Sequence, residues 1–354
     1  MRSYNIALIP GDGIGQEVIP AGMNALETIA RSDGGFTLHA ESFPWGCQYY
    51  LDHGVMMAAD GLEKLRSYDA IYFGAVGLSS AVPDHISLWG LVLPIRTAFD
   101  QYVNLRPVHL LPGIPGHLRT KGSKDIDFVV IRENTEGEYS GAGGRVHVGT
   151  PQEVAIQTTI FTRMGVERII RYAFELARTR RKKVTSATKS NAMQHVMVFW
   201  DEVFSQVAKD YPDVTTEKWH VDALSARFIT HPQTLDVVVG SNFFGDILSD
   251  LGGALMGSLG MPASANINPE RRYPSMFEPV HGSAPDIMGK GIANPLAAIW
   301  AGAMMLDFLG EGEAARRIRV AVERVTADGR VLTPDLGGTA HTSDVTAAVC
   351  AHLA

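Results

Sequence analysis

Paired carboxylates in the segment NFFGDILSDLGG, residues 242–253, are the first feature that could do chemistry. Asp246 and Asp250 stand four residues apart in a pattern typical of a helix, so their side chains share one face. Mg²⁺ prefers oxygen ligands of this kind, with substrate and water completing the set. Aspartates near the start of a helix also commonly serve only to complement its dipole, and the spacing alone leaves both roles open.

Two more charged residues follow stretches with the pattern of strands. Lys189, in VTSATKSNAM, stands between a strand of small residues and a helix for which Ser190 or Asn191 is the expected cap. A lysine in such a place is either solvent-facing or desolvated, and desolvation lowers its pKa toward that of a general base. Asp222, in KWHVDALSARF, is either a helix cap or a third carboxylate for a metal.

Three arginines are candidates for holding an anionic substrate. Arg96 and Arg106 fall in LVLPIRTAFDQYVNLRPV, and Arg132 ends an apolar strand in VVIRENTEGEY. Ligands of α/β proteins bind at the ends of parallel strands, and a guanidinium group matches a carboxylate with two hydrogen bonds. A surface position is the alternative, above all for Arg96. Together the three arginines predict a dicarboxylate substrate.

The segment FEPVHGSAPDIMGKGIANP, residues 277–295, is rich in glycine and proline and also in hydrogen-bonding groups. Its polar members are Glu278, His281, Ser283, Asp286 and Asn294. A plain surface loop can have this composition. The density of donors and acceptors nevertheless favours a cofactor site.

The segment IALIPGDGIGQEV, residues 6–18, places glycines between a strand and a helix but lacks a Rossmann fingerprint. The fingerprint needs G-x-G-x-x-G and an acidic residue about 20 positions further on. Gln16 stands where the third glycine belongs, and Asp33 lies in the turn-like RSDGG. The segment therefore predicts a glycine turn, and a bound nucleotide must be held mainly elsewhere.

Strand-like and helix-like stretches alternate along the chain, which predicts an α/β protein with a largely parallel sheet. The expected strands are 5–9, 70–76, 127–133, 183–189 and 235–241, and the expected helices are 15–32, 163–179, 192–209 and 296–309. Residues 136–160 break this alternation with glycine and β-branched residues. They predict a hairpin that projects from the body and packs on a partner subunit.

The composition is that of an ordinary globular protein. The 354 residues, 45% hydrophobic and 19% charged, suffice for two domains that share a cleft. A net charge of −7 offers no basic surface to nucleic acid, and no apolar run reaches the roughly 20 residues of a membrane span. Cys47 and Cys350 lack the spacing of a disulfide framework or a zinc site. With no secretory signal evident, we expect a cytoplasmic enzyme whose partners include neither nucleic acid nor membrane.

The motifs IPGDGIGQE, ENTEGEYSG, TKSN, NFFGDILSDLGG and EPVHGSAPDI, in this order, resemble those of the metal-dependent β-decarboxylating dehydrogenases, the family of isopropylmalate and isocitrate dehydrogenases. The resemblance covers nearly the whole chain. The segments YDAIYFGAVG, VPDHISLWG and FDQYVNLRP resemble the tartrate and D-malate dehydrogenase branch. This implies the two-domain α/β fold of that family, not a Rossmann fold, with residues 1–102 and 254–354 forming a cofactor-binding domain and 103–253 a substrate and dimerisation domain.

The resemblance implies NAD-dependent oxidation and β-decarboxylation of a 2-hydroxy dicarboxylic acid, D-malate or tartrate, with 3-isopropylmalate as the alternative. Lys189 would remove the hydroxyl proton and Tyr139 would protonate the enolate. Arg96, Arg106 and Arg132 would clamp the carboxylates, and Asp222, Asp246 and Asp250 would hold Mg²⁺ or Mn²⁺. In the family Lys189 and Asp222 reach the site from the neighbouring subunit, which implies a homodimer. A need for K⁺ stays open.

The resemblance also assigns cofactor and specificity residues. Glu278 would lie near the nicotinamide ribose, and the adenosine half of NAD would contact His281, Gly282, Ser283, Ala284, Asp286, Ile287 and Asn294. The charge of Asp286 would repel a 2′-phosphate, which favours NAD over NADP. In SLWGLVLPIR, residues 87–96, Trp89, Val92 and Leu93 would face the substrate, and they offer nothing polar to a third carboxylate.

Pro94 departs from the pattern expected for the helix that carries Arg96. Proline costs about 3 kcal/mol inside a helix, so this helix begins later or is kinked.

Two alternative functions come from other classes. One is a non-catalytic regulatory paralogue, and the other is a metal-dependent decarboxylase or lyase without net redox.

Overall fold

The computed structural model describes residues 1–354, and these divide into two compact units. Unit 1 comprises Met1–Gln101, His109–Ser123 and Gly253–Ala354, and unit 2 comprises Tyr102–Val108 and Lys124–Gly252. The division falls within a residue or so of the expected boundaries at 102/103 and 253/254. Residues 109–123 differ from expectation, because they cluster with unit 1.

Unit 1 contains a mixed β-sheet. Its strands, in spatial order, are β2 (Phe36–Ser42), β1 (Arg2–Gly11), β3 (Ala70–Ala75), β12 (Ser275–Pro279) and β11 (Ala263–Ile267). Neighbours from β2 to β12 are parallel, whereas β11 runs antiparallel to β12. All six residues of β3 are buried, as expected for a continuous apolar run at the centre of a parallel sheet.

Two long helices, α1 (Gly15–Asp33) and α10 (Leu296–Leu309), pack on this sheet. Two more, α11 (Gly312–Asp328) and α12 (Thr342–Ala351), pack on those helices and on each other. Shorter segments are α2 (Cys47–His53), α3 (Gly61–Leu65), α4 (Asp84–Ser87), α5 (Leu93–Ala98) and the 3₁₀ turn η4 (Pro334–Leu336). The hydroxyl of the fully buried Tyr72 on β3 donates to the carbonyl of Ala298 on α10 at 2.6 Å, and Gly22 of α1 lies against the same hydroxyl. One side chain thus joins the strand to two helices.

A π-helical turn explains how Pro94 is accommodated. The turn η1 (Leu88–Val92) follows α4, and the amide of Leu93 donates to the carbonyl of Leu88, five residues back. Pro94 follows this wider turn as the second residue of α5, and helical backbone runs without a break from Asp84 to Ala98. The helix carrying Arg96 therefore does not begin later, and the π turn before the proline is the local irregularity that accommodates it.

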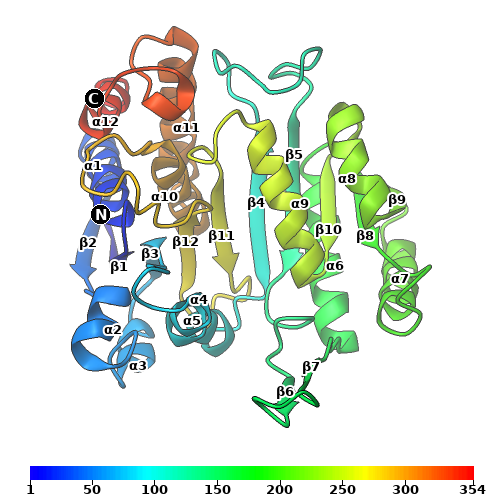
Figure 1. Ribbon diagram of the computed structural model, residues 1–354. Helices are drawn as coiled ribbons and strands as arrows, with labels where there is room; N and C mark the ends of the chain where they lie inside the picture. Colours follow the sequence, from blue (N-terminus) through cyan, green and yellow to red (C-terminus); the bar gives the residue numbers. More distant parts are fainter. The chain divides into compact units, whose positions relative to one another are not determined.

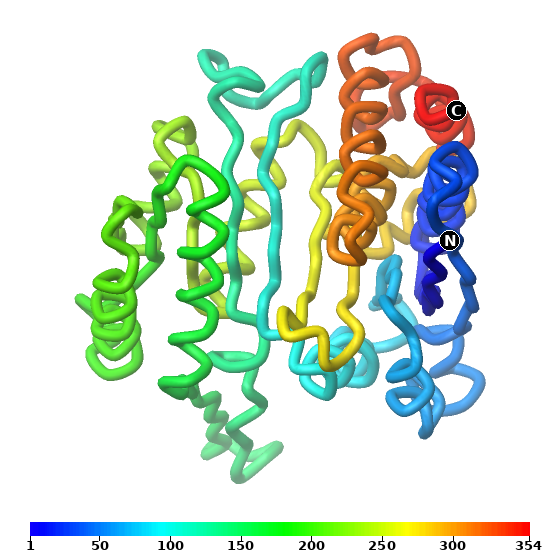
Figure 2. Tube along the Cα trace, turned by 180° about the vertical axis from the view of Figure 1, so that it is seen from behind, coloured from blue at the N-terminus to red at the C-terminus, as the bar shows by residue number.

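Unit 2 contains a second set of strands. In spatial order they are β4 (Val103–His109), β5 (Asp127–Glu133), β10 (Val237–Gly240), β8 (Lys183–Thr188) and β9 (Thr215–His220). The pairs β5–β10, β10–β8 and β8–β9 are parallel. The helices are α6 (Arg163–Arg178), α7 (Val196–Val207), α8 (Val221–Thr230) and α9 (Asn242–Leu255), with the 3₁₀ turns η2 (Ala208–Asp210) and η3 (Pro232–Thr234). Helix α9 covers the face seen in Figure 1 and α6 the face seen in Figure 2.

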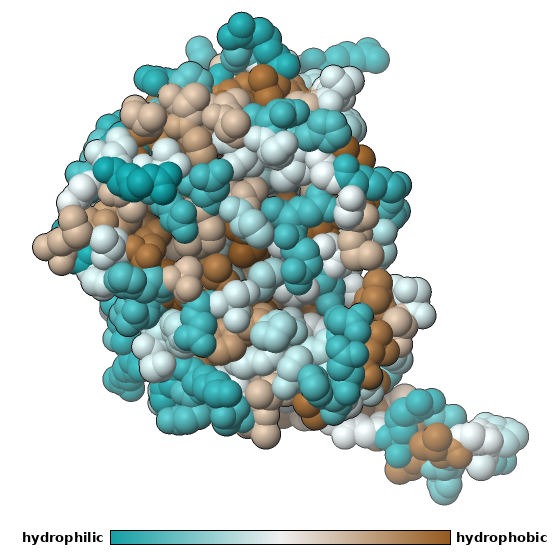
Figure 3. Space-filling model, turned by 90° about the vertical axis from the view of Figure 1, so that its left-hand side faces the viewer, coloured by the Kyte–Doolittle hydropathy of each residue, from teal (hydrophilic) through white to brown (hydrophobic).

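A two-stranded arm projects from unit 2. Strands β6 (Gly143–Val146) and β7 (Val154–Gln157) pair antiparallel, and every residue in them is exposed. The arm extends below the rest of unit 2 in Figures 1 and 2, and Figure 3 shows hydrophobic spheres on it beside hydrophilic ones. The predicted hairpin is confirmed, and its contact with a partner subunit stays a prediction.

The predicted alternation of strands and helices is confirmed, with one helix start in error. Helix α7 begins at Val196 with His195 as its N-terminal flanking residue, not at a cap formed by Ser190 or Asn191. Residues 190–192 instead form a turn, in which the carbonyl of Lys189 accepts the amide of Ala192 at 3.0 Å. Both cysteines are free, Cys47 buried and Cys350 partly exposed.

None of the helices is both long and apolar enough to cross a membrane.

We expect Gly22→Ala to lower the free energy of unfolding by about 2 kcal/mol, because the added methyl group would overlap the Tyr72 hydroxyl in a filled core. In a Tyr72→Phe background the loss should fall to about 1 kcal/mol, since the hydroxyl oxygen is gone, the nearest remaining atom is Cζ at 2.9 Å, and alanine favours the helix. Urea unfolding measures both. Gly122→Ala is the control, because its Cβ would meet no atom within 4 Å. Equal losses in the two backgrounds would contradict this packing.

Candidate active site

Arg132 is the most buried of the candidate arginines, with 3% of its surface exposed. It lies near the end of β5, beside Gly240 of β10, the strand that leads into α9. The side-chain oxygen of Asn242, the first residue of α9, accepts hydrogen bonds from Nε at 3.0 Å and Nη2 at 2.7 Å. Helix α9 can approach β5 this closely because residue 245 is glycine. A Cβ at that position would lie only 2.6 Å from the Cβ of Arg132. A buried guanidinium group thus has a fixed position.

Asp246 is the centre of the charged cluster in unit 2. Its Oδ1 forms an ion pair with Arg132 and lies 3.4 Å from Nη1 of Arg106. Its Oδ2 accepts the hydroxyl of Tyr139 at 3.1 Å. One carboxylate therefore links two arginines and a tyrosine that lie 107 to 140 residues before it in the sequence.

Arg106 joins β4 to the next turn of α9. Its Nη1 donates to the hydroxyl of Ser249 at 2.7 Å and lies 3.4 Å from Oδ1 of Asp250. Partial burial and the neighbouring charge of Asp246 raise the pKa of Asp250, while Arg106 opposes this rise. The predicted sharing of one helix face by Asp246 and Asp250 is what allows both to meet Arg106.

Tyr139 is held over the same cluster. The Arg132 guanidinium lies 5.5 Å from the centre of its ring. Burial, followed by the charge of Asp246, raises the pKa of the tyrosine, so its hydroxyl carries a proton at neutral pH. The buried carboxylate of Glu133 fixes the start of the loop that leads to Tyr139, accepting the amides of Thr135 at 2.9 Å and Glu136 at 2.8 Å. The arrangement can present a proton donor beside a carboxylate-binding site.

Lys189 and Asp222 form a separate pair in unit 2. They follow the ends of the parallel strands β8 and β9, where Thr188 is in register with His220, and Nζ lies 2.8 Å from Oδ1. The lysine is thus ion-paired and 28% exposed, not isolated among apolar groups. The hydrogen bond from Lys189 lowers the pKa of Asp222. Asp222 does not cap α8 as considered above, because His220 holds the flanking position and Asp222 stands in the first turn.

The donor chemistry at Asp246 and Asp250 fits a hard divalent cation. Two carboxylates on one helix face, one of them with a raised pKa, favour an added positive charge. Within the chain no group of three histidine, cysteine, aspartate or glutamate side chains is placed to hold a metal ion. Asp222 therefore does not join the other two aspartates in one copy of the chain.

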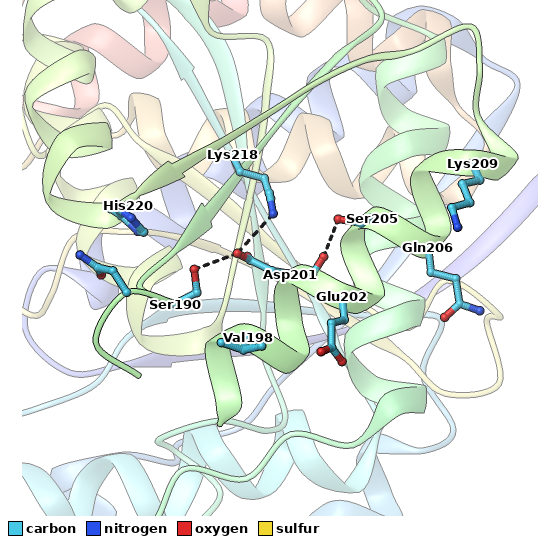
Figure 4. A pocket seen from close by; sticks show the side chains of 10 residues that line it. Ser190, Val198, Asp201, Glu202, Ser205, Gln206, Lys209, Lys218 and His220 are labelled. Atoms are coloured by element: carbon cyan, nitrogen blue, oxygen red, sulfur yellow. Dashed lines mark hydrogen bonds and ion pairs between the residues drawn. The ribbon is translucent and has the colours of Figure 1, made fainter. Parts of the chain in front are cut away.

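An open groove of about 750 Å³ lies beside the Lys189 turn, and none of the predicted site residues lines it. Figure 4 shows Ser190 and Lys218 both directed toward Asp201 of α7. Oδ2 of Asp201 accepts Ser190 Oγ at 2.9 Å and lies 3.4 Å from Lys218 Nζ. Asp201 thereby connects the turn that carries Lys189 to strand β9. The groove itself mixes acidic and basic side chains without a concentration of either.

In unit 1 the third candidate arginine, Arg96, pairs with Glu278. Nη2 and Oε1 lie 2.8 Å apart, and each side chain is 9% exposed. Asn266 of β11 donates to the same oxygen at 2.7 Å. The surface alternative for Arg96 is therefore wrong. Arg96 was expected to contact the substrate and Glu278 the nicotinamide ribose, but in the structure they are paired with each other.

The rest of the predicted cofactor segment forms a loop after β12. The buried Nε2 of His281 has no hydrogen-bond partner, and burial lowers the pKa of the ring. Gly282 faces open space, and Asp286 is exposed. Asn294 is buried and bonds internally, with Nδ2 3.0 Å from Asp335 and Oδ1 accepting the amide of Leu296. An unsatisfied buried nitrogen beside open space and an exposed carboxylate fits a polar ligand such as a dinucleotide.

The specificity residues lie in different environments. Val92 belongs to the core of unit 1 and is 3% exposed, and Leu93 is 8% exposed. Trp89 is 47% exposed. Of the three, Trp89 is the side chain that is open to contact.

Sequence reasoning did not identify several residues that hold the candidates in place. They are Asn242 and Ser249, which bind Arg132 and Arg106, together with Asn266, which binds Glu278, and Asp201. Asn242 and Ser249 carried a detectable signal, since they stand four residues before and three after Asp246 on the same helix. Asn266 carried none, because its partner is on another strand.

Comparison with known proteins gives consistent results over the whole chain. Residues 5–349 match the family described as isocitrate/isopropylmalate dehydrogenase. A probable tartrate dehydrogenase/decarboxylase of Agrobacterium vitis is 59% identical, with 100% of this chain and 99% of that protein covered. The decarboxylating D-malate dehydrogenase of Escherichia coli (strain K12) is 57% identical, with 99% and 98% covered. The crystal structure of isocitrate dehydrogenase from Methylococcus capsulatus is similar, with a TM-score of 0.88, 38% identity and 99% of each chain covered.

We expect Glu278→Gln to lower the free energy of unfolding by about 3 kcal/mol, because it leaves the buried charge of Arg96 unpaired. Urea unfolding measures this loss. Glu313→Gln is the matched control, since Glu313 pairs with Arg316 at 2.6 Å on the surface, where solvent screening leaves such a pair little effect on stability. Similar losses in the two variants would show that burial does not set the strength of the Arg96 pair.

Proposed function

This chain belongs to the isocitrate/isopropylmalate dehydrogenase family, and we propose that it catalyses the NAD- and divalent-metal-dependent oxidation and β-decarboxylation of D-malate or tartrate. The chain is an oxidoreductase of the decarboxylating dehydrogenase type. The observation that carries the proposal is the cluster in unit 2 that joins Arg106, Arg132 and Tyr139 to Asp246 and Asp250.

The arginines bind the carboxylates of the substrate. Arg132 and Arg106 are buried at strand positions and held by Asn242 and Ser249, so their guanidinium groups are oriented before a ligand arrives. Two such groups suit a dicarboxylic acid. Arg96, in unit 1, keeps the substrate-binding role that the sequence resemblance implies.

The bound cofactors supply two capabilities: NAD accepts a hydride, and Mg²⁺ or Mn²⁺, held by Asp246, Asp250 and Asp222, supplies positive charge to the substrate oxygens. The neutral amine form of Lys189 takes the proton of the 2-hydroxyl group as the hydride leaves C2, which leaves an ammonium group. The product is a 2-keto acid with a carboxylate on the β-carbon. Asp222, at 2.8 Å from Lys189, positions the ammonium group between turnovers.

Tyr139 completes the reaction. The bond between the β-carboxylate and the adjacent carbon breaks, CO₂ leaves, and the electron pair remains as an enolate. The Tyr139 hydroxyl donates its proton to that carbon, which yields pyruvate from D-malate. The contact with Asp246 at 3.1 Å and the arginine beneath the ring hold the hydroxyl in place.

The loop after β12 binds NAD in this proposal. His281 offers an unsatisfied buried nitrogen, and the exposed Asp286 is available to accept hydrogen bonds from the adenosine ribose. Its negative charge disfavours a 2′-phosphate, so we propose NAD over NADP. Asn294 reaches the cofactor through its backbone, since its side chain is already bonded within unit 1.

The names of the similar proteins favour D-malate and tartrate over isopropylmalate as substrate. Trp89 is the exposed specificity residue, and it carries no positive charge to pair with a third carboxylate. The test is steady-state kinetics with D-malate, tartrate and 3-isopropylmalate, each with NAD and Mn²⁺, following NADH and CO₂ together. Release of CO₂ without NADH would instead identify the decarboxylase alternative.

A homodimer with shared sites forms part of the proposal. Two observations support it. Asp222 is not grouped with Asp246 and Asp250 within one chain, so a third carboxylate has to come from a second copy. The arm exposes apolar side chains, with Val154 45% and Ile156 58% exposed, and a partner subunit would cover them.

We expect Tyr139→Phe to reduce turnover of D-malate by a factor of about 100 to 10,000, with KM changed far less, because the hydroxyl acts in proton transfer. Steady-state kinetics with NAD and Mn²⁺ measures both constants. Tyr49→Phe is the control for loss of a tyrosine hydroxyl in general. Turnover of the Tyr139 variant within threefold of the wild type would remove this residue from the mechanism.

Mixing two inactive variants tests the sharing of sites. Lys189→Ala and Asp246→Ala should each be nearly inactive alone. When they are unfolded and refolded together, about half the dimers are mixed, and each mixed dimer has one intact site, so roughly a quarter of wild-type activity should return. Wild-type chains refolded in parallel provide the reference. No recovery, with normal refolding of the wild type, would place both residues in one subunit.

A further inference from the structure

The glycine turn GDGIG, residues 11–15, has no part in the chemistry proposed above, yet it contacts the candidate NAD loop directly. The amide of Ile14 donates to the carbonyl oxygen of Ser283 at 2.8 Å, and a Cβ at Gly13 would overlap that oxygen. The φ of +57° at Gly13 also favours glycine. The turn therefore supports the beginning of the loop through its backbone.

Glu17 provides a second support further along the same loop. It stands in the first turn of α1, and its Oε1 accepts the amide of Gly289 at 2.6 Å. Its other oxygen, Oε2, is buried and has no hydrogen-bond partner. Hydrogen bonds to an ionised acceptor are shorter and roughly twice as strong as neutral ones. Glu17 thus fixes the chain six residues beyond Ser283.

The segment between these two supports carries residues assigned to NAD, Asp286 and Ile287 among them. Its own hydrogen bonds are local turns, from the amide of Ile287 to Ala284 at 3.1 Å and from that of Lys290 to Ile287 at 3.2 Å. Ala284 has a φ of +41°, which residues other than glycine adopt only where the surroundings impose it. The conformation of the segment therefore depends on its two ends.

We propose that Glu17 is a positioning residue for the cofactor, holding residues 284–288 in the conformation that binds the adenosine half of NAD. This inference rests on the proposed function, which assigns the loop to NAD. Without the carboxylate the loop has to be ordered on binding, and that cost weakens affinity. The chemical step is untouched, because Glu17 contacts neither substrate nor reacting atoms in this assignment.

The test compares Glu17→Ala and Glu17→Gln with Glu27→Ala, a control on an exposed part of the same helix whose nearest cation, Arg31, is 3.8 Å away. NADH binding to the full chain is measured by fluorescence titration without turnover. We expect the dissociation constant to rise about tenfold for Glu17→Ala and about threefold for Glu17→Gln, which keeps an acceptor, and to stay constant for the control. Hydrogen exchange at the Gly289 amide should be faster in Glu17→Ala.

Kinetics distinguishes positioning from a general loss of structure. The inference requires a higher KM for NAD with kcat at saturating NAD unchanged, and a fall in kcat with KM unchanged overturns it. If wild type binds NADH and Glu17→Ala binds within twofold of it, the inference fails while the proposed function stands. A wild-type chain that does not bind NADH contradicts the proposed function itself. Should Glu17→Ala not fold, Glu17→Asp replaces it, and an Asp variant with wild-type affinity overturns the inference, because the shorter side chain cannot reach Gly289.

Discussion

The buried charge of Arg132 constrains how α9 packs against β5, and the charged cluster of unit 2 depends on that packing. A guanidinium group with 3% exposure is stable only when its donors are bonded and its charge is balanced. Asn242 and Asp246 satisfy both needs, and both come from α9, which has to approach β5 closely enough for Gly245 to have no side chain. The position of Asp246 then fixes where Arg106 and Tyr139 find their partner. The cluster therefore follows from satisfying one buried cation.

Unit 1 meets the same requirement with different residues. Arg96 is balanced by Glu278, and Asn266 bonds the same carboxylate oxygen, so neither charge is left unpaired in the core. Backbone contacts do the remaining work. Gly13 lies against Ser283, and Glu17 bonds the amide of Gly289, so the loop after β12 is joined to the glycine turn and to the first turn of α1.

These internal pairs bear on how the proposed reaction begins. In the free chain the arginines and aspartates of unit 2 neutralise one another. A divalent cation and a dicarboxylate bring opposite charges of equal size, so the cation can take the aspartates and the substrate the arginines with no net charge added to the site. The arginine–aspartate pairs keep the charged groups oriented before the cation and the substrate bind, and no charge is left without a partner.

The sequence by itself determined the local features and the candidate residues. Hydrophobic periodicity located five strands (β1, β3, β5, β8 and β10) and long helices such as α1, α6 and α10, but not β2, β4, β9, β11 and β12. The i,i+4 spacing put Asp246 and Asp250 on one face, and Gln16 argued against a Rossmann turn. Only the tertiary structure decided that Arg96 pairs with Glu278, 182 residues away, and that Asn242 and Ser249 orient the other arginines. It also decided that α7 starts at Val196 and that a π turn accommodates Pro94. The reason is physical: periodicity and capping depend on residues a few positions apart, whereas the partner of a buried charge depends on which strands and helices pack together.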